Sequence, residues 1–586
     1  MGMPSIFEIR RVVEYSAFFV DDAPMDVPAT LKRFNRYTLI RMASVLSIHY
    51  GNLCFPDNKN TLFSESSKKH MPFLNKLFRD YYKRIGLKPD QKVEILTYRT
   101  SLELWRHIFS IHVDEFTNDV ERSDAELLLF KIVLTLNEKI LSFNLNKEQH
   151  NLDELLFLNS FLTNDSNNYD FQAILQPQLF YFYQLVQFIP SSVVLTKAAE
   201  LLFSNWGIDN WQQYYSSIFV IAKETDTLRK EKGVQVISPD WIERNKSFVS
   251  LSFINHLSIN EEDYIPFADD VVSQNELNID YRKFRGKPFV KLKDGSGFVV
   301  INNQLLCERL FNSLYFDFKP LINGKVNSCG YFDFNKDFIE NNLFRRTIIS
   351  CLPRNCFLFP HKGVDRQEEP HEPDFYARTK RGELIIVECK AIKMNGECRD
   401  DGDYHRLLEE LHEKIVRRTH NLDSTRKSLK AESEPIGIGQ LIHHIDSIEA
   451  DSFKWDNGIP DDVIYYPLLV FEDVKLVQKG ILSLVNRWFN EDVRNDWKEL
   501  SLSSIEYRPV MVVSINTLFL LNYFLRKNNL TDVIDSFVKA NAVYNPNTGE
   551  YVFSNMADFD EYLLSKPYDK RDVMIQWHRR LMSQSK

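Results

Sequence analysis

The sequence lacks the paired cysteine motifs that build zinc sites and disulfide-rich scaffolds. Its 7 cysteines are an odd number scattered through 586 residues, and no Cys-x-x-Cys pair occurs. Scattered, unpaired cysteines are typical of reduced thiols, which act as small buried apolar side chains. We therefore expect no structural zinc, no disulfide framework and a cytoplasmic location.

Long apolar runs are also missing. The most apolar stretch, residues 510–525, is interrupted by polar side chains and is too short to span a bilayer. No apolar run follows a basic patch near the start, so no signal peptide is predicted, and we expect a soluble chain without a membrane partner. The pattern Gly-x-x-x-x-Gly-Lys-Ser/Thr is absent as well, which argues against a P-loop motor.

The composition has no excess of basic charge. The formal net charge is −9, so a nucleic-acid-binding protein of this composition has to concentrate Lys and Arg on one surface. Apolar residues make up 44% and charged residues 26%, as in ordinary globular proteins. The length suggests about two to four domains with large cores.

The hydrophobic pattern divides the chain into four regions, and the predicted fold class is multidomain, α plus α/β. Apolar spacings of three and four over most of residues 1–235 predict a mostly helical module for sensing, oligomerisation or partner binding. Residues 236–330 are predicted to form a connector with a β-hairpin around an Asp-Gly turn. An α/β domain with a central mixed sheet flanked by helices is expected over 331–530, followed by a helical extension over 531–586.

The chemistry of the chain is concentrated in one short segment. Asp374 follows a proline and opens a strand, and a glycine-containing turn then leads into the apolar run 384–387. Side chains alternate across a strand, so Glu388 and Lys390 are predicted to share one face and Cys389 to lie on the other. We expect this hairpin to bring two carboxylates and one ammonium to one end of a sheet.

These groups suit metal-dependent hydrolysis. Carboxylate oxygens bind Mg²⁺ or Mn²⁺, usually with several waters retained. A bound divalent ion lowers the pKa of water and neutralises phosphate charge, and a nearby lysine orients or deprotonates the attacking water. The competing interpretation is a surface hairpin with an ordinary salt bridge.

The Pro-Asp pair that ends at Asp374, followed by Glu388-Cys389-Lys390, resembles the PD-(D/E)xK nuclease superfamily. The resemblance covers roughly residues 335–520 and implies a C-terminal restriction-endonuclease-like domain. It implies that Asp374, Glu388 and the main-chain carbonyl of Cys389 bind Mg²⁺ or Mn²⁺. It also implies that Lys390 positions the attacking water.

Further site residues follow from the same resemblance. Many members carry a metal-proximal glutamate on the helix before the hairpin, which predicts Glu340 as a metal ligand, with Glu372 as the poorer candidate. Some branches carry a glutamine on the helix after the hairpin, and Gln440 is well placed there to reach a metal-bound water or a phosphate. His443 and His444 are interpreted as scaffold or nucleic-acid contacts. Adjacent helical residues point about 100° apart, so these two side chains cannot easily ligate one ion together.

Two charged segments offer basic side chains to a nucleic acid. Residues 397–434 form an insertion with charges of both signs, predicted to be helical over 405–430. We favour a solvated arm over a phosphate-binding surface, because acidic residues are at least as numerous there. For the net basic stretch 566–586, a docked terminal helix is favoured over a nucleic-acid contact.

The sequence therefore predicts a cytoplasmic, Mg²⁺-dependent PD-(D/E)xK endonuclease that hydrolyses phosphodiester bonds. Double-stranded DNA is the favoured substrate, with RNA left open, and by analogy we expect a restriction-like or anti-phage defence effector. The alternatives are a repair or recombination nuclease acting on branched DNA, and a catalytically inert nucleic-acid-binding protein. Since cutting both strands usually needs two active sites, a homo-oligomer is expected, and an activating protein partner is left open.

Overall fold

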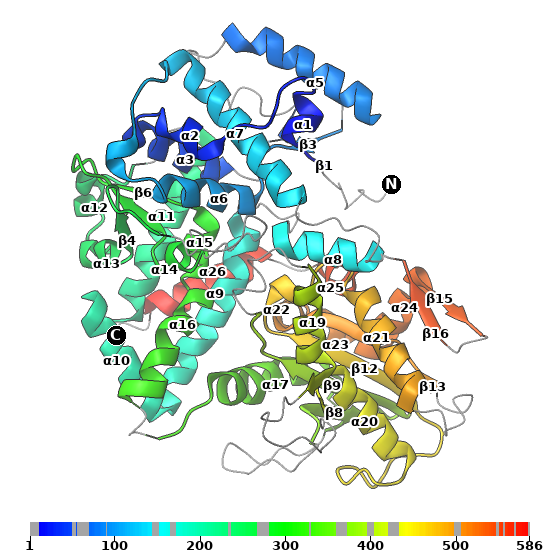
Figure 1. The fold of residues 1–586 in the computed structure, drawn as a ribbon. Helices are drawn as coiled ribbons and strands as arrows, with labels where there is room; N and C mark the ends of the chain where they lie inside the picture. The colour runs from blue at the N-terminus through cyan, green and yellow to red at the C-terminus, as the bar shows by residue number, and fades with distance from the viewer. Residues whose placement is uncertain are drawn as a thin grey trace, which may run out of the picture.

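The computed structural model is mostly helical, with a mixed β-sheet in its C-terminal half, which agrees with the predicted α plus α/β class. Figure 1 shows the N-terminal helices at the top and the largest sheet at the lower right. The structure describes residues 11–49, 54–55, 69–88, 91–142, 152–163, 171–231, 236–266, 281–326, 330–354, 356–358, 372–394, 404–419, 433–496, 506–546, 550–554, 557–567 and 570–583.

The first part of the chain is built from helices, as its apolar spacing predicts. A short sheet with the order β1-β3-β2 (Arg11–Val12, Val93–Glu94, Cys54–Phe55) accompanies them. The helices are α1 (Tyr15–Phe18), α2 (Val27–Lys32), α3 (Arg36–His49), α5 (Met71–Ile85), α6 (Tyr98–Phe109), α7 (Arg122–Ser142), α8 (Leu152–Thr163), α9 (Phe171–Phe188), α10 (Val193–Trp206) and α11 (Trp211–Glu231).

The predicted hairpin of the connector is present. Strands β5 (Phe289–Lys291) and β6 (Phe298–Val300) pair antiparallel, and β4 (Ser258–Asn260) pairs parallel to β5. The helices around this sheet are α12 (Pro239–Arg244), α13 (Leu251–His256), α14 (Arg282–Gly286), α15 (Asn303–Glu308) and α16 (Asn312–Pro320).

The hairpin lies between two clusters of buried apolar side chains. One cluster combines residues 13–136 with 259–305, and the other runs from residue 157 to residue 581. Val290 belongs to the first cluster and its neighbour Phe289 to the second, because side chains alternate across a strand. A strand that is buried on both faces has apolar residues at consecutive positions of its sequence. The predicted domain boundaries stay a prediction, since burial alone does not divide the chain.

The largest sheet has the order β7-β8-β9-β12, with β13 and β14 both paired to β12 at its far edge. Strand β8 (Phe375–Arg378) runs antiparallel to its two neighbours, β7 (Phe357–Leu358) and β9 (Glu383–Lys390). Strands β12 (Ile464–Phe471), β13 (Glu506–Tyr507) and β14 (Met511–Ser514) run parallel to β9. The carboxyl ends of β9, β12 and β14 therefore meet at one edge of the sheet.

Helices cover this sheet and leave its central strands buried. Before it in the chain come the π-helical segment η7 (Phe334–Phe344) and α17 (Arg345–Cys351). Helices α20 (Ile438–Glu449) and α21 (Ile481–Asp496) pack together, α20 against β9 and α21 against β14. After the last strand come α22 (Ile515–Leu520), α23 (Asn522–Asn528) and α24 (Leu530–Asn541).

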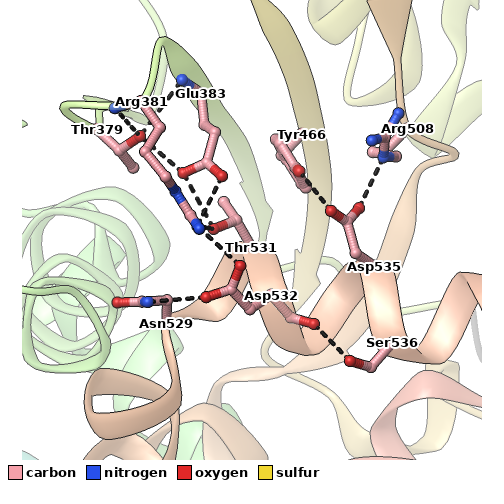
Figure 2. Close-up of polar contacts among 10 residues, drawn as sticks. All are labelled: Thr379, Arg381, Glu383, Tyr466, Arg508, Asn529, Thr531, Asp532, Asp535 and Ser536. Carbon is pink, nitrogen blue, oxygen red and sulfur yellow. Dashed lines mark hydrogen bonds and ion pairs between the residues drawn. The ribbon is translucent and has the colours of Figure 1, made fainter.

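Helix α24 is tied by polar contacts to the edge of the sheet opposite the carboxyl end of β9. Figure 2 shows Glu383, the first residue of β9, accepting hydrogen bonds from the hydroxyls of Thr379 (2.7 Å) and Thr531 (3.2 Å). Asp535 on the same helix accepts from Tyr466 Oη at 3.0 Å and Arg508 Nε at 2.7 Å. The helix thus anchors β9, β12 and the segment after β13.

The charged insertion is only partly helical. Helix α19 (Tyr404–Ile415) ends before strand β10 (Arg417–Thr419), which pairs with β11 (Ser433–Pro435). The predicted helix over 405–430 is therefore wrong from residue 417 to residue 419, and its part beyond residue 419 lies outside the described residues. The segment after α19 contains few apolar residues, so the spacing of apolar residues does not indicate where the helix ends.

The C-terminal part contains the hairpin β15 (Ala542–Asn545) and β16 (Glu550–Phe553) and two helices, α25 (Phe559–Leu564) and α26 (Lys570–Ser583). The predicted docking of the terminal helix is confirmed, because Trp577 is buried against Phe180 and Phe519. No single helix within the described residues is long and apolar enough to cross a membrane. One pair of consecutive helices, Leu175–Ser191 and Val193–Trp206, reaches the length and apolar composition of a membrane span when the two are taken together, but the pair is bent by 115°.

Candidate active site

The predicted site residues meet at the carboxyl end of β9. In the β8–β9 pairing Phe375 lies opposite Val387, so Asp374, just before β8, is level with Glu388. The backbone N–H of Cys389 donates to Asp374 Oδ2 at 2.8 Å, which fixes the Asp374 side chain against β9. Gly382, with φ +80°, forms the turn between the strands in the left-handed conformation that glycine adopts most readily.

Lys390 joins the two carboxylates. Its Nζ lies 2.9 Å from Glu388 Oε2 and 3.4 Å from Asp374 Oδ2. Strand alternation places Glu388 and Lys390 on the same face, as the sequence predicts. The expected meeting of two carboxylates and one ammonium at a sheet end is therefore present, while their metal-binding and catalytic roles stay predictions.

Solvent reaches the cluster mainly at Asp374. The Glu388 side chain is 0% exposed and that of Lys390 12%, whereas that of Asp374 is 24% exposed. Charged side chains are rarely buried this completely unless they are paired. A ligand from solvent would therefore meet Asp374 before it meets Glu388.

Burial and mutual charge move the three groups away from their ordinary titration ranges. Burial, and then the charge of Glu388, raise the pKa of Asp374 well above its usual range. Burial alone would raise the pKa of Glu388, but Lys390 and His444 outweigh it and lower that pKa to about 2. Burial alone would lower the pKa of Lys390, but the two carboxylates outweigh it and raise that pKa. Asp374 is thus the acid on which negative charge is least favourable, and added positive charge beside it would be stabilising.

His444 is a site neighbour that the sequence reasoning left as scaffold or nucleic-acid contact. Its Nε2 lies 3.0 Å from Glu388 Oε1, and its side chain is 1% exposed. A signal was available, because His444 falls three residues after Leu441 and four before Ile448 on the apolar face of α20. A histidine on a buried helix face needs a polar partner, and Glu388 is that partner here.

The other predicted residues surround this cluster. Glu340, on η7, contributes negative charge that raises the pKa values of both Asp374 and Lys390. Gln440 Oε1 accepts a hydrogen bond from the backbone N–H of Gly437 at 2.8 Å, so its carbonyl oxygen closes the first turn of α20. Glu372 lies outside the three-residue cluster, and its negative charge acts on the Arg345 guanidinium.

A second group of charges lies beside the cluster at the same sheet edge. Glu472 follows β12, and its N–H donates to the carbonyl of Lys390 at 3.3 Å. Lys393 Nζ lies 2.6 Å from Glu472 Oε2 and 3.7 Å from Asp473 Oδ2. Lys414, from α19, donates to the Lys393 carbonyl at 2.6 Å, which links the charged insertion to this edge.

The oxygen donors of the cluster suit a divalent ion that keeps several waters. Within the described part of the chain, no three His, Cys, Asp or Glu side chains are grouped to hold a metal ion. Asp374 and Glu388 nevertheless offer hard oxygen atoms, the kind of ligand that Mg²⁺ and Mn²⁺ prefer. Mg²⁺ commonly uses one or two protein carboxylates and keeps several waters, so a pair of carboxylates fits that ion.

Comparisons of the chain with protein-family models, with curated proteins and with solved structures give no match.

Proposed function

We propose that the protein is a metal-dependent endonuclease of the PD-(D/E)xK type. The observation that carries this proposal is the meeting of Asp374, Glu388 and Lys390 at the end of β9, where Lys390 Nζ is within 3.4 Å of both carboxylates. An ordinary surface salt bridge would leave its side chains largely in water. Here Glu388 is fully buried, and burial of a charged cluster is typical of functional sites.

The order of elements also supports the proposal. A helix precedes three antiparallel strands, and helix α20 then leads to β12, which runs parallel to β9. That order suits the restriction-endonuclease-like fold that the sequence resemblance implies. Asp374 stands directly before β8, and Glu388 and Lys390 lie on β9.

Asp374 and Glu388, helped by the main-chain carbonyl of Cys389 and with Glu340 nearby, would bind Mg²⁺ or Mn²⁺. A bound divalent ion would supply an activated water and neutralise phosphate charge. The remaining roles in the reaction belong to the side chains of the protein. Asp374, the most exposed of the three clustered side chains, would face the substrate. Glu388 is fully buried and contacts His444 on α20.

Lys390 is proposed to orient the attacking water and to offset negative charge on the phosphate. Without a bound cation the two carboxylates raise the pKa of its ammonium, which donates hydrogen bonds to them. A protonated ammonium positions an oxygen nucleophile and stabilises developing negative charge, but it does not remove a proton. We therefore assign Lys390 an orienting role.

The proposed substrate is nucleic acid, with double-stranded DNA favoured, and the proposed biological role is restriction-like or anti-phage defence. A homo-oligomer would supply the second active site that cleavage of both strands needs. The N-terminal helical module is proposed to sense a trigger or to bind an activating partner. Its buried side chains up to residue 136 belong to a different apolar cluster from those of the large sheet, whereas those from residue 157 onward share the cluster of the sheet.

Cleavage of supercoiled plasmid with Mg²⁺ tests the proposal. Wild type should nick or linearise the plasmid, and Asp374→Asn and Lys390→Ala should each lower the rate by about a hundredfold or more. Lys380→Ala is the matched control, because Lys380 is an exposed lysine in the turn of the same hairpin. Linear, branched and single-stranded DNA and RNA, tested in parallel, distinguish a defence endonuclease from a repair nuclease.

One outcome would replace the proposal with the non-catalytic alternative. If wild type binds nucleic acid but cleaves none of these substrates with Mg²⁺ or Mn²⁺, and Lys390→Ala behaves in the same way, the nuclease function is refuted.

A further inference from the structure

We infer that His444 is a positioning residue, which holds the Glu388 carboxylate in the orientation that metal binding requires. This inference rests on the proposed nuclease function and deepens it. The two residues are 56 positions apart in sequence, and the packing of α20 against β9 brings His444 Nε2 to 3.0 Å from Glu388 Oε1.

Packing alone does not explain a histidine at this position. On the same face of α20, Leu441 and Ile445 are 0% exposed, and His444, at 1%, is as deeply buried. A polar ring on an apolar face lowers stability unless it is hydrogen-bonded, and an apolar residue would fill the space without that need. The hydrogen bond to Glu388 is therefore the feature that makes histidine suitable here.

The two oxygens of Glu388 are held from different elements. Oε1 faces His444 on α20, and Oε2 accepts from Lys390 Nζ at 2.9 Å on β9 itself. Two such contacts prevent rotation of the carboxylate about its terminal bond. A carboxylate has roughly four acceptor positions, so both oxygens keep capacity for a further ligand. Orientation by such outer partners is how ligand carboxylates are commonly fixed before a metal binds.

The His444 ring has no competing polar role among the described residues. Its Nδ1 is buried without a hydrogen-bond partner, so the ring offers one nitrogen to one partner, Glu388. The Trp455 ring lies beside it, nearly perpendicular at 87° with ring centroids 6.5 Å apart, and helps to set the plane of the His444 ring. A histidine kept for general polarity or for a nucleic-acid contact would be expected at the surface.

Two amide substitutions separate the hydrogen bond from other effects. In His444→Gln the side-chain amide nitrogen takes the approximate place of Nε2, whereas in His444→Asn it takes the place of Nδ1 and cannot reach Glu388. Both variants keep a buried polar side chain, so they share most folding costs. His405→Gln is the control, because it makes the same change at an exposed position on α19.

Mn²⁺ binding to the full chain, measured by isothermal titration calorimetry without nucleic acid, is the primary measurement. We expect His444→Asn to weaken Mn²⁺ binding by about tenfold to a hundredfold, and His444→Gln to stay within about threefold of wild type. The Mg²⁺ concentration for half-maximal plasmid cleavage should shift in the same order. Circular dichroism confirms that each variant is folded before it is compared.

The possible failures are distinguishable. If wild type binds Mn²⁺ no better than Asp374→Asn, the proposed function fails, and the role of His444 in metal binding fails with it. If wild type binds Mn²⁺ but the two folded His444 variants bind it equally well, only the positioning role is overturned.

Discussion

Replacing Lys390 with methionine removes the ammonium that joins two carboxylates and keeps a side chain of similar length. Lys390 Nζ is 2.9 Å from a fully buried Glu388 oxygen and 3.4 Å from Asp374. At an effective dielectric constant near 20, each contact corresponds to about 5 kcal/mol of attraction before the desolvation cost of the lysine is subtracted. Removing one partner of a buried pair costs about 3–5 kcal/mol, because the remaining charge is left uncompensated.

We therefore expect β9 to open locally far more often in Lys390→Met. A loss of about 3 kcal/mol corresponds to roughly a hundredfold faster amide exchange if β9 opens as a unit. Hydrogen–deuterium exchange of peptides covering residues 383–394, at pH 7.5 with EDTA, measures this directly. Local exchange is preferable to a global unfolding curve, because a chain of this size does not unfold in one two-state step.

The contribution of Glu388 to stability should also reverse its dependence on pH. In wild type the pKa of Glu388 is lowered, so this group contributes stability above its unfolded pKa of about 4.3, which is lost as pH falls toward 2. Without Lys390 the Glu388 pKa should lie above the unfolded value. The variant then gains protection as pH falls from 7.5 to 5, because the folded state binds the extra proton.

Two results would refute this reasoning. Unchanged β9 exchange in Lys390→Met at pH 7.5 would mean that the ammonium does not stabilise the buried carboxylates. Equal acceleration in Lys380→Ala, the exposed lysine of the same hairpin, would mean that the exchange reports on the turn and not on the cluster.

Three further predictions follow from the same contacts. Asp374→Asn should abolish cleavage yet leave the melting temperature unchanged or higher, because the raised pKa of Asp374 shows that its negative charge is unfavourable without metal. For the same reason, protection of β8 from exchange in metal-free buffer should fall in wild type as pH rises from the unfolded-state pKa of about 4 through the higher folded-state pKa. The variant, which has no carboxyl group at this position, should not show this fall. Asp535→Asn weakens the contacts to Arg508 and Tyr466 and should lower the free energy for opening of α24 by about 1 kcal/mol. The expected effect is small because the Asp535 side chain is 41% exposed. Hydrogen–deuterium exchange of residues 530–541 measures it. Trp577→Ala should destabilise the docked α26 by about 3–5 kcal/mol, which limited proteolysis after residue 566 would detect, while α6 stays protected.

Much of the candidate site could be predicted because its signals are local. The proline before Asp374, the glycine in the turn and the apolar run before Glu388 lie within 18 positions, and side-chain alternation fixes which residues share a face. Hairpins close over short distances, so few other arrangements compete with the one observed. The roles of these residues remain predictions.

Long-range pairing was harder to predict. The contact of His444 with Glu388 depends on how α20 packs against β9, and only the apolar spacing around Leu441 pointed to it. Strand β10 was missed because it follows a helix in a charged segment and pairs with a strand beyond it. The π-helical form of Phe334–Phe344 was missed as well, because spacings of three and four describe an ordinary α-helix.

The polar contacts of α24 bear on how the chain tolerates shortening. Strand β9, which is 8 residues long, begins at Glu383, whose carboxylate accepts a hydrogen bond from Thr531, and ends at Lys390. Deleting everything after residue 529 would remove α24 from the start of that strand and leave the Glu383 carboxylate without its Thr531 partner. The last tenth of the chain, which carries no predicted site residue, therefore belongs to the smallest fragment in which the site can be expected to assemble.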